Sequence, residues 1–148
     1  MLKVLIAEDE FMIADQLEDA LIGSGYDVCG IARTVDEAVA LAELHKPDLA
    51  VFDVRLARGG RGPEIVRRLK NAARFGVLYA TGDDVRHSRL TLADGDASIA
   101  KPYRMEDVAR ALVIVQEIVT AGTATPPFPP GFRLLPESAS GSPQVAPA

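Results

Sequence analysis

The chain has 148 residues, of which 48% are hydrophobic and 25% charged, as is typical of one soluble globular domain with a buried core. Its formal net charge of −5 disfavours general binding to the phosphate backbone of nucleic acids, and no apolar run has the length of a membrane span. The single cysteine, Cys29, excludes an internal disulfide. Because no signal peptide is visible either, we expect a cytoplasmic protein.

Strand-like and helix-like segments alternate along the chain. A strand is predicted over residues 2–7, a helix over 11–22, a strand over 26–32, and a helix from the Thr34 capping box to Leu44. A strand over 49–53 and a helix that begins at Pro63 follow. The pattern then gives a strand over 75–80, a weak helix through 92, a strand over 97–100 and an amphipathic helix over 105–120.

Five strands that alternate with helices predict an α/β fold. The expected arrangement is a doubly wound, five-stranded parallel sheet with helices on both faces, over residues 1–121. Such sheets bind ligands at the carboxyl ends of their strands. Residues at the ends of the predicted strands are therefore the candidates for a functional site.

Residues 122–148 differ in composition from the rest of the chain. They contain seven of the ten prolines, together with many serines, threonines and alanines, which predicts a flexible C-terminal tail. Four apolar residues leave a second interpretation open, in which the tail docks on the domain or on a partner: Phe128, Phe132, Leu134 and Leu135.

Charged and polar side chains stand where four of the predicted strands end. Glu8 and Asp9 follow the first strand, Asp53 ends the third, Thr81 follows the fourth and Lys101 follows the fifth. In a parallel sheet these residues converge on one edge.

Clustered carboxylates repel one another unless a cation lies between them, and their hard oxygens suit Mg²⁺. Asp53 is then placed to act as a nucleophile that forms an acyl phosphate. Lys101 and Thr81 supply an ammonium group and a hydroxyl for the phosphoryl oxygens.

This ordered set of residues resembles the response regulator receiver domain of two-component signalling, over about residues 1–121. The resemblance implies a flavodoxin-like sheet of strand order 2-1-3-4-5. It also implies that Asp53 takes a phosphoryl group from a histidine kinase or a phosphotransfer protein, in a Mg²⁺-dependent reaction that the receiver itself catalyses. It implies metal binding by Glu8, Asp9, Asp53 and the main-chain carbonyl of Arg55, with Thr81 and Lys101 at the phosphate.

The chain departs from the family pattern in three places. Ser98 stands three positions before Lys101, where receivers commonly carry an aromatic switch residue. The segment between Thr81 and Lys101 is short and polar, so a fourth helix is expected to be reduced or mobile. The run 79–82 is similar to the Phe-Ala-Thr-Gly motif of a subset of single-domain receivers, but the later aromatic of that subset is replaced by Asp83 and Asp84.

Several functions stay open at this stage. The first is a stand-alone receiver that signals through protein contacts with an unidentified downstream partner, without an attached output domain, as a monomer or a homodimer. The second is a phosphate shuttle or sink, and a third is a degenerate receiver that only binds a partner. A hydrolase of the haloacid dehalogenase type would need a second aspartate at position 55, where this chain has Arg55. Neither nucleic acid nor a membrane is expected as a partner.

Overall fold

The computed structural model describes residues 1–82 and 89–138. The elements, in chain order, are β1 (Lys3–Ala7), α1 (Phe11–Gly23), β2 (Asp27–Ala32), α2 (Val35–His45), β3 (Leu49–Asp53), a 3₁₀ turn (Ala57–Gly59), α3 (Gly62–Arg68), β4 (Gly76–Thr81), β5 (Ala97–Ala100), α5 (Met105–Ala121) and β6 (Phe132–Leu134). Each predicted strand lies within one residue of its observed bounds.

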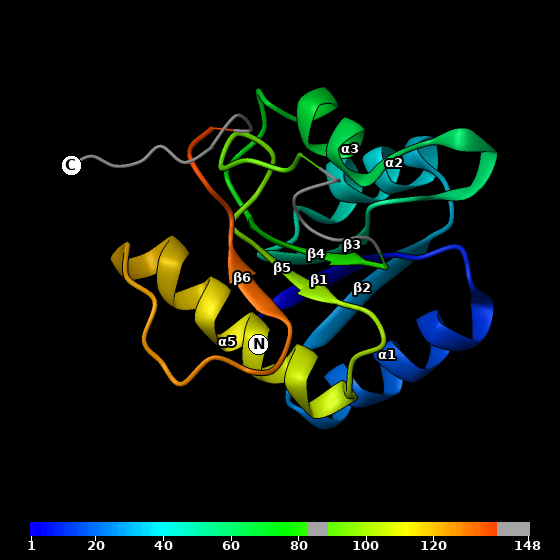
Figure 1. Cartoon of the computed structure of the whole chain (residues 1–148). Helices are drawn as coiled ribbons and strands as arrows, with labels where there is room; N and C mark the ends of the chain where they lie inside the picture. The colour runs from blue at the N-terminus through cyan, green and yellow to red at the C-terminus, as the bar shows by residue number, and fades with distance from the viewer. Residues whose placement is uncertain (83–88, 139–148) are drawn as a thin grey trace.

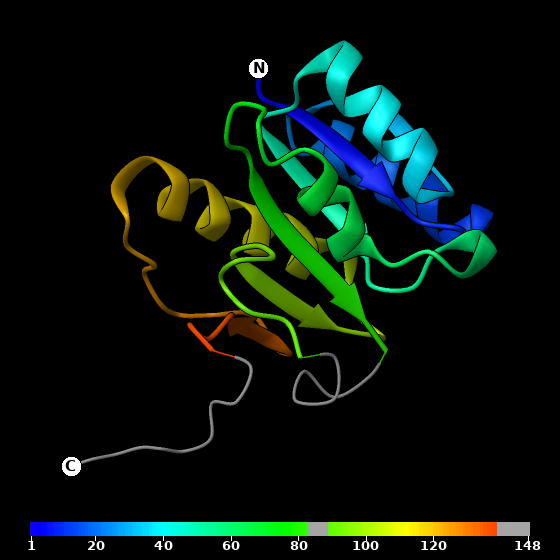
Figure 2. The same cartoon turned by 90° about the horizontal axis from the view of Figure 1, so that it is seen from above.

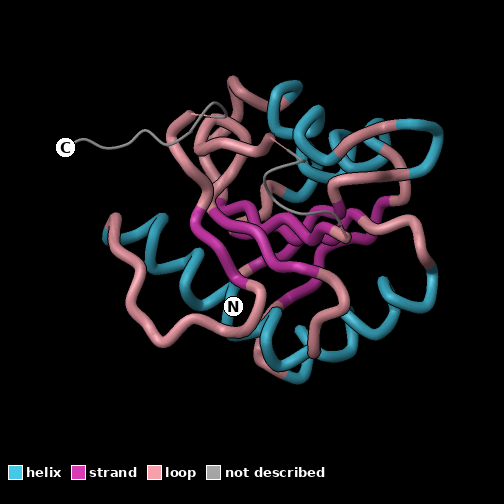
Figure 3. Tube along the Cα trace, viewed as in Figure 1, coloured by secondary structure: helices cyan, strands magenta, loops and turns pink. Residues whose placement is uncertain are grey.

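A twisted sheet forms the middle layer of the molecule, with α2 and α3 on one face and α1 and α5 on the other (Figure 1, Figure 3). The strand order is β2-β1-β3-β4-β5-β6. The first five strands pair in parallel, which Figure 2 shows as a common direction for β1, β4 and β5. The predicted doubly wound sheet and the order 2-1-3-4-5 are confirmed.

The core has two halves, because the central strands β1, β3 and β4 are buried on both faces and their side chains alternate between the faces. On β3, Ala50 and Phe52 face α2 and α3, whereas Leu49 and Val51 face α1 and α5. The Phe52 ring packs edge-on against Tyr79, with centroids 6.4 Å apart. This two-sided burial explains why these central strands appear in the sequence as apolar runs.

The sheet has six strands, where the sequence predicts five. β6 comes from the segment predicted as a flexible tail, and it pairs antiparallel with β5, with Phe132 opposite Ile99. Phe132 and Leu135 are buried. This part of the segment therefore packs on the domain, as in the second interpretation left open by the sequence. The physical reason is that β5 would otherwise leave a row of backbone groups and an apolar surface unpaired at the sheet edge. Residues 139–148 of the predicted tail lie outside the described residues.

The weak helix predicted before β5 lies partly on residues 83–88, outside the described residues. Its described remainder, 89–92, is not helical, and residues 89–96 as a whole form turns and bends. Its Thr91 amide donates to the Asp94 carboxylate at 2.9 Å, and the Tyr79 hydroxyl donates to the Asp94 carbonyl at 2.6 Å. Within 1–82 and 89–138, no helix combines the length and apolar character needed to cross a membrane.

Candidate functional site

The strand register brings the predicted site residues to one edge of the sheet. Ala7 pairs with Phe52, so Glu8 and Asp53, which follow them, lie side by side. Asp53 pairs with Ala80, one residue before Thr81 on β4. Thr81 in turn pairs with Ala100, one residue before Lys101. The carboxyl ends of β1, β3, β4 and β5 are therefore level with one another.

Lys101 joins two of the carboxylates at this edge. Its Nζ lies 2.8 Å from Asp53 Oδ2 and 3.2 Å from Glu8 Oε1. The Lys101 amide donates to the Thr81 carbonyl at 2.8 Å, which fixes the start of the lysine side chain. The second Asp53 oxygen, Oδ1, accepts the Arg55 amide at 3.3 Å. Both oxygens of Asp53 are thus held in place by donors.

Three carboxylates at this edge have the arrangement of a cation site. Glu8, Asp9 and Asp53 each offer one oxygen, and these atoms lie within 4.8 Å of one another. Beside them is a cleft of about 370 Å³, lined by Asp9, Glu10, Asp53, Val54, Arg55, Thr81, Gly82 and Lys101. Carboxylate oxygens in a small open cleft are ligands that suit Mg²⁺, so the residues present fit this ion.

Burial sharpens the electrostatics of the cluster. Only 2% of Glu8 and 8% of Asp53 are exposed. Burial, reinforced by the Asp53 charge, raises the pKa of Glu8 to about 7, although hydrogen bonds from the Glu10 amide and Lys101 oppose the rise. Burial also disfavours the Lys101 charge, but its ion pairs with Asp53 and Glu8 outweigh that effect and raise the pKa of Lys101. A second cation would relieve the remaining repulsion.

The loop that follows Asp53 is held by a close backbone approach. The Gly62 amide donates to the Val54 carbonyl at 2.9 Å, and a Cβ atom added at Gly62 would lie 2.5 Å from the Asp53 carbonyl oxygen. Only a glycine lets the chain pass so near. The loop therefore returns to the strand end, which keeps Arg55 at the rim of the cleft.

All six residues predicted for the site lie at this edge. Glu8, Asp9 and Asp53 form the acidic cluster, Lys101 contacts two of its members, and Thr81 and Arg55 line the cleft. The structure does not test which of them bind a metal or a phosphate, so those roles stay predictions.

Two further residues belong to the surroundings of the site. Glu10, the residue before α1, lines the cleft, with Oε2 3.9 Å from Lys101 Nζ. The Tyr103 hydroxyl is buried without a hydrogen-bond partner among the described residues. Burial, together with the nearby Glu8 charge, raises the pKa of Tyr103. The only sequence signal for Tyr103 was an aromatic residue two positions after Lys101.

Ser98 is a small residue at the position where receivers commonly carry an aromatic side chain. It is fully buried on β5, in register with Tyr79 of β4 on one side and Arg133 of β6 on the other. Its hydroxyl has no hydrogen-bond partner within residues 1–82 and 89–138. An aromatic residue of β4, Tyr79, is fully buried next to this position.

The fold and the site together define a class of protein. The sequence profile of the response regulator receiver domain matches residues 4–113. The chain belongs to this family, as the resemblance in the sequence indicated.

Relatives with known names support this assignment. The chain is 38% identical, over 112 residues, to the transcriptional regulatory protein PdtaR of Mycobacterium tuberculosis, a match that covers 74% of this chain and 54% of PdtaR. It is 34% identical over 111 residues to the phyllosphere-induced regulator PhyR of Methylorubrum extorquens, with 74% of this chain and 42% of PhyR covered. The chain therefore spans about half the length of these relatives.

A solved structure shows the same fold. The receiver domain of the PhyR response regulator of Erythrobacter litoralis is 28% identical and superposes with a TM-score of 0.67. The match covers 85% of this chain and 96% of that domain.

Proposed function

We propose that Asp53 is the phosphoacceptor of this receiver and takes its phosphoryl group from the phosphohistidine of a histidine kinase or a phosphotransfer protein. The observation that carries the proposal is the contact of Lys101 with Asp53 at 2.8 Å, beside the acidic cluster. A lone aspartate at a strand end would be an ordinary turn residue. An aspartate with a lysine on one oxygen, a backbone amide on the other and two further carboxylates nearby fits phosphoryl transfer.

The reaction requires one bond to form and one to break. A carboxylate oxygen of Asp53 attacks phosphorus, the phosphorus–nitrogen bond to the imidazole breaks, and an acyl phosphate results. Lys101 then exchanges its contacts with Asp53 and Glu8 for a phosphoryl oxygen. The Thr81 hydroxyl, which also lines the cleft, donates to a second phosphoryl oxygen.

Glu8, Asp9, Asp53 and the main-chain carbonyl of Arg55 would hold Mg²⁺ in this proposal. When bound, the ion offsets the charge of the cluster and of the incoming phosphoryl group. The support for this metal is the hard oxygen donor set and the short distances among the three carboxylates.

The consequence of phosphorylation is proposed to be a changed contact with another protein, in the cytoplasm. A phosphate shuttle or sink would use the same acceptor chemistry. A shuttle passes the group on to a second histidine, whereas a sink loses it to water by hydrolysis of the acyl phosphate. Incubation of the phosphorylated chain with an unphosphorylated phosphotransfer protein separates these functions, because only a shuttle transfers its label.

The test is to label the whole chain with a small phosphodonor and Mg²⁺ and to measure the intact mass. The wild-type chain gains one phosphoryl group, Asp53→Asn gains none, and Asp19→Asn, at an exposed site on α1, behaves as wild type. Equal labelling of Asp53→Asn would overturn the assignment.

A further inference from the structure

The segment after α5 runs back along the domain as a strap, which we define as residues 123–136. It leaves the end of α5 at Gly122, crosses the side of that helix and then adds β6 to the edge of β5 (Figure 1, Figure 2). Two kinds of contact hold it, and they differ in strength.

The first half of the strap is tied to the surface of α5 by polar contacts. Glu117 accepts three hydrogen bonds: from the Thr125 amide at 3.0 Å and from the hydroxyls of Thr125 and Thr123 at 2.6 and 2.7 Å. Arg110 donates to the carbonyls of Thr125 and Pro127 at 3.4 and 3.3 Å. These hydrogen bonds lie at the exposed surface, so water competes for every contact, and their net stabilisation is small.

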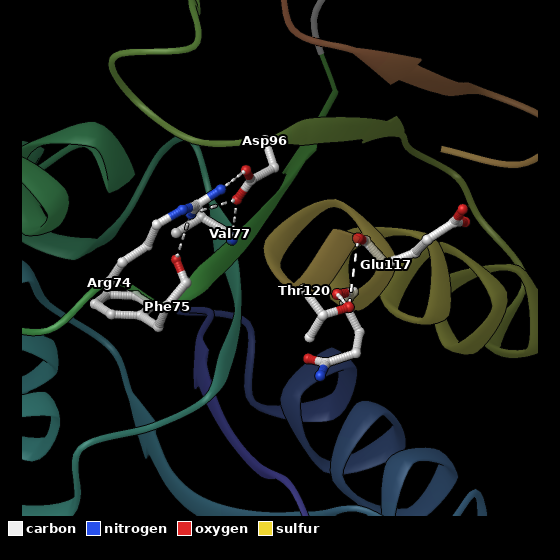
Figure 4. Close-up of polar contacts among 7 residues, drawn as sticks. Arg74, Phe75, Val77, Asp96, Glu117 and Thr120 are labelled. Carbon is white, nitrogen blue, oxygen red and sulfur yellow. Dashed lines mark hydrogen bonds and ion pairs between the residues drawn. The ribbon is translucent and has the colours of Figure 1, made fainter. Parts of the chain in front are cut away.

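The second half of the strap occupies the sheet edge through its backbone. The Ala100 amide donates to the Gly131 carbonyl at 3.1 Å, and the Leu135 amide donates to the Asp96 carbonyl at 3.1 Å. The Asp96 carboxylate is itself fixed by the Val77 amide and the Arg74 guanidinium (Figure 4). The domain therefore presents a rigid strand edge to the strap.

Two side chains of the strap enter the core. Phe132 packs in the half of the core under α5, and Leu135, three positions later, packs in the other half. Prolines at 129, 130 and 136 flank β6 and have no amide to donate. A strand of three residues, few buried side chains and polar contacts at the surface make the strap a local unit that opens far more readily than the domain unfolds.

The strap is also linked to the candidate phosphorylation site through the backbone of β5. Ala100 donates its amide to the strap, and the next residue, Lys101, donates its amide to Thr81 and holds Asp53 with its side chain. Gly131 has a positive φ of 77°, and a Cβ atom there would lie 3.2 Å from the Ala100 side chain, so strap and strand end fit closely. A shift of Lys101 toward a phosphoryl oxygen therefore acts on the backbone to which the strap is bonded.

We propose that the β5 edge is a strand-docking site, which the strap occupies in cis and which phosphorylation of Asp53 frees for an extended segment of a partner protein. The seated strap specifies the chemistry of that segment. It pairs antiparallel with β5, it carries an aromatic residue in the place of Phe132, and it has an aliphatic residue three positions later. The link to phosphorylation rests on the function proposed above.

The strap itself supplies the probe. A fluorescent peptide with the sequence of residues 128–137 is titrated against the whole chain, and polarisation reports binding. A tethered segment has an effective concentration on the order of millimolar, so micromolar peptide binds the unmodified wild-type chain poorly. Glu117→Ala loosens the strap and is expected to tighten peptide binding about tenfold, whereas Glu43→Ala on α2 leaves it unchanged.

Labelling with a small phosphodonor and Mg²⁺ is expected to tighten peptide binding of the wild-type chain by a similar factor, but not that of Asp53→Asn. A peptide with serine in place of Phe132 should bind neither form. The intact mass of the same samples is measured, so the extent of labelling is known independently of peptide binding.

Labelled protein with unchanged affinity would overturn this inference and leave the acceptor role of Asp53 intact. Absence of label would overturn the acceptor role and the link to it. Faster amide exchange at Ala100 and Leu135 in Glu117→Ala, without a gain in peptide binding, would overturn the docking site itself.

Discussion

Two buried carboxylates, Asp53 and Glu8, share the ammonium group of Lys101. Lys101 contacts both Asp53 and Glu8, and neither carboxylate is more than a tenth exposed. Burial of Glu8, and after it the neighbouring charge of Asp53, raises the pKa of Glu8, and the Lys101 ammonium group only partly offsets this rise. At the scale of single residues, the carboxylates of the site repel one another, and a further cation or a proton would reduce this repulsion.

Removal of the ammonium group at Lys101 tests its role in transfer. Lys101→Met should lower the rate of labelling by a small phosphodonor about 10-fold to 100-fold. A hydrogen bond to a charged group is worth about 1.5–3 kcal/mol, and that stabilisation of the phosphoryl oxygens is lost. The rate is followed by intact mass, with the exposed Lys70→Met as the matched control. An unchanged rate in Lys101→Met would show that the lysine only neutralises the unmodified site.

The proton on Glu8 makes stability depend on pH. The pKa of this carboxyl is 4.5 without the protein environment and about 7 in the fold, so between these values the folded chain holds a proton that the unfolded chain has lost. The contribution of Glu8 to stability is therefore complete below pH 4.5 and is lost as the pH rises to about 7, by at most about 3 kcal/mol.

Urea unfolding of the metal-free chain at a series of pH values measures this loss. Glu8→Gln keeps the shape of the side chain without the titration, so its unfolding free energy should decline less over the same range. Identical slopes in both proteins would place the titration elsewhere.

At the scale of elements, the loop between β3 and α3 depends on the backbone approach at Gly62. Gly62→Ala should destabilise the chain by more than about 1 kcal/mol, since the new methyl group would lie 2.5 Å from the Asp53 carbonyl, which is backbone and yields little. Gly23→Ala, at the end of α1 with open space around it, is the matched control and should be neutral or slightly stabilising. Chemical denaturation compares them, and an equal effect of both would contradict the close approach.

The elements differ in how far the sequence determines them. β1, β3 and β4 are buried on both faces, so each appears as an apolar run with clear ends, and their bounds were predicted closely. β6 has three residues between prolines, and only its pairing with β5 defines it as a strand. Such a nonlocal contact leaves no periodic signal. The acidic cluster was predictable because strand ends in a parallel sheet are level, whereas the environment of Tyr103 depends on side-chain packing that spacing does not reveal.

At the scale of the whole molecule, the acidic cluster adds to a net charge of −5. Mg²⁺ should therefore stabilise the folded chain, because it binds the cluster only when the strand ends are assembled. At about 100 times its Kd, the ion should add about 2.7 kcal/mol and raise the melting temperature by roughly 5–10 °C. Thermal unfolding measures the shift against sodium chloride of equal ionic strength. A shift of the same size in a Glu8→Gln, Asp9→Asn double variant would show that the ion binds elsewhere.

The family is shown by the receiver profile over residues 4–113, and the acceptor role of Asp53 is the central proposal built on it. The most direct measurement is to label the chain with a small phosphodonor, reduce it with borohydride and sequence the fragments by mass spectrometry. Borohydride reduces an aspartyl phosphate to homoserine, so the modified residue is marked by a permanent change. We predict homoserine at position 53 and at no other aspartate. Homoserine at another position, or a labelled chain that contains none, would contradict the assignment.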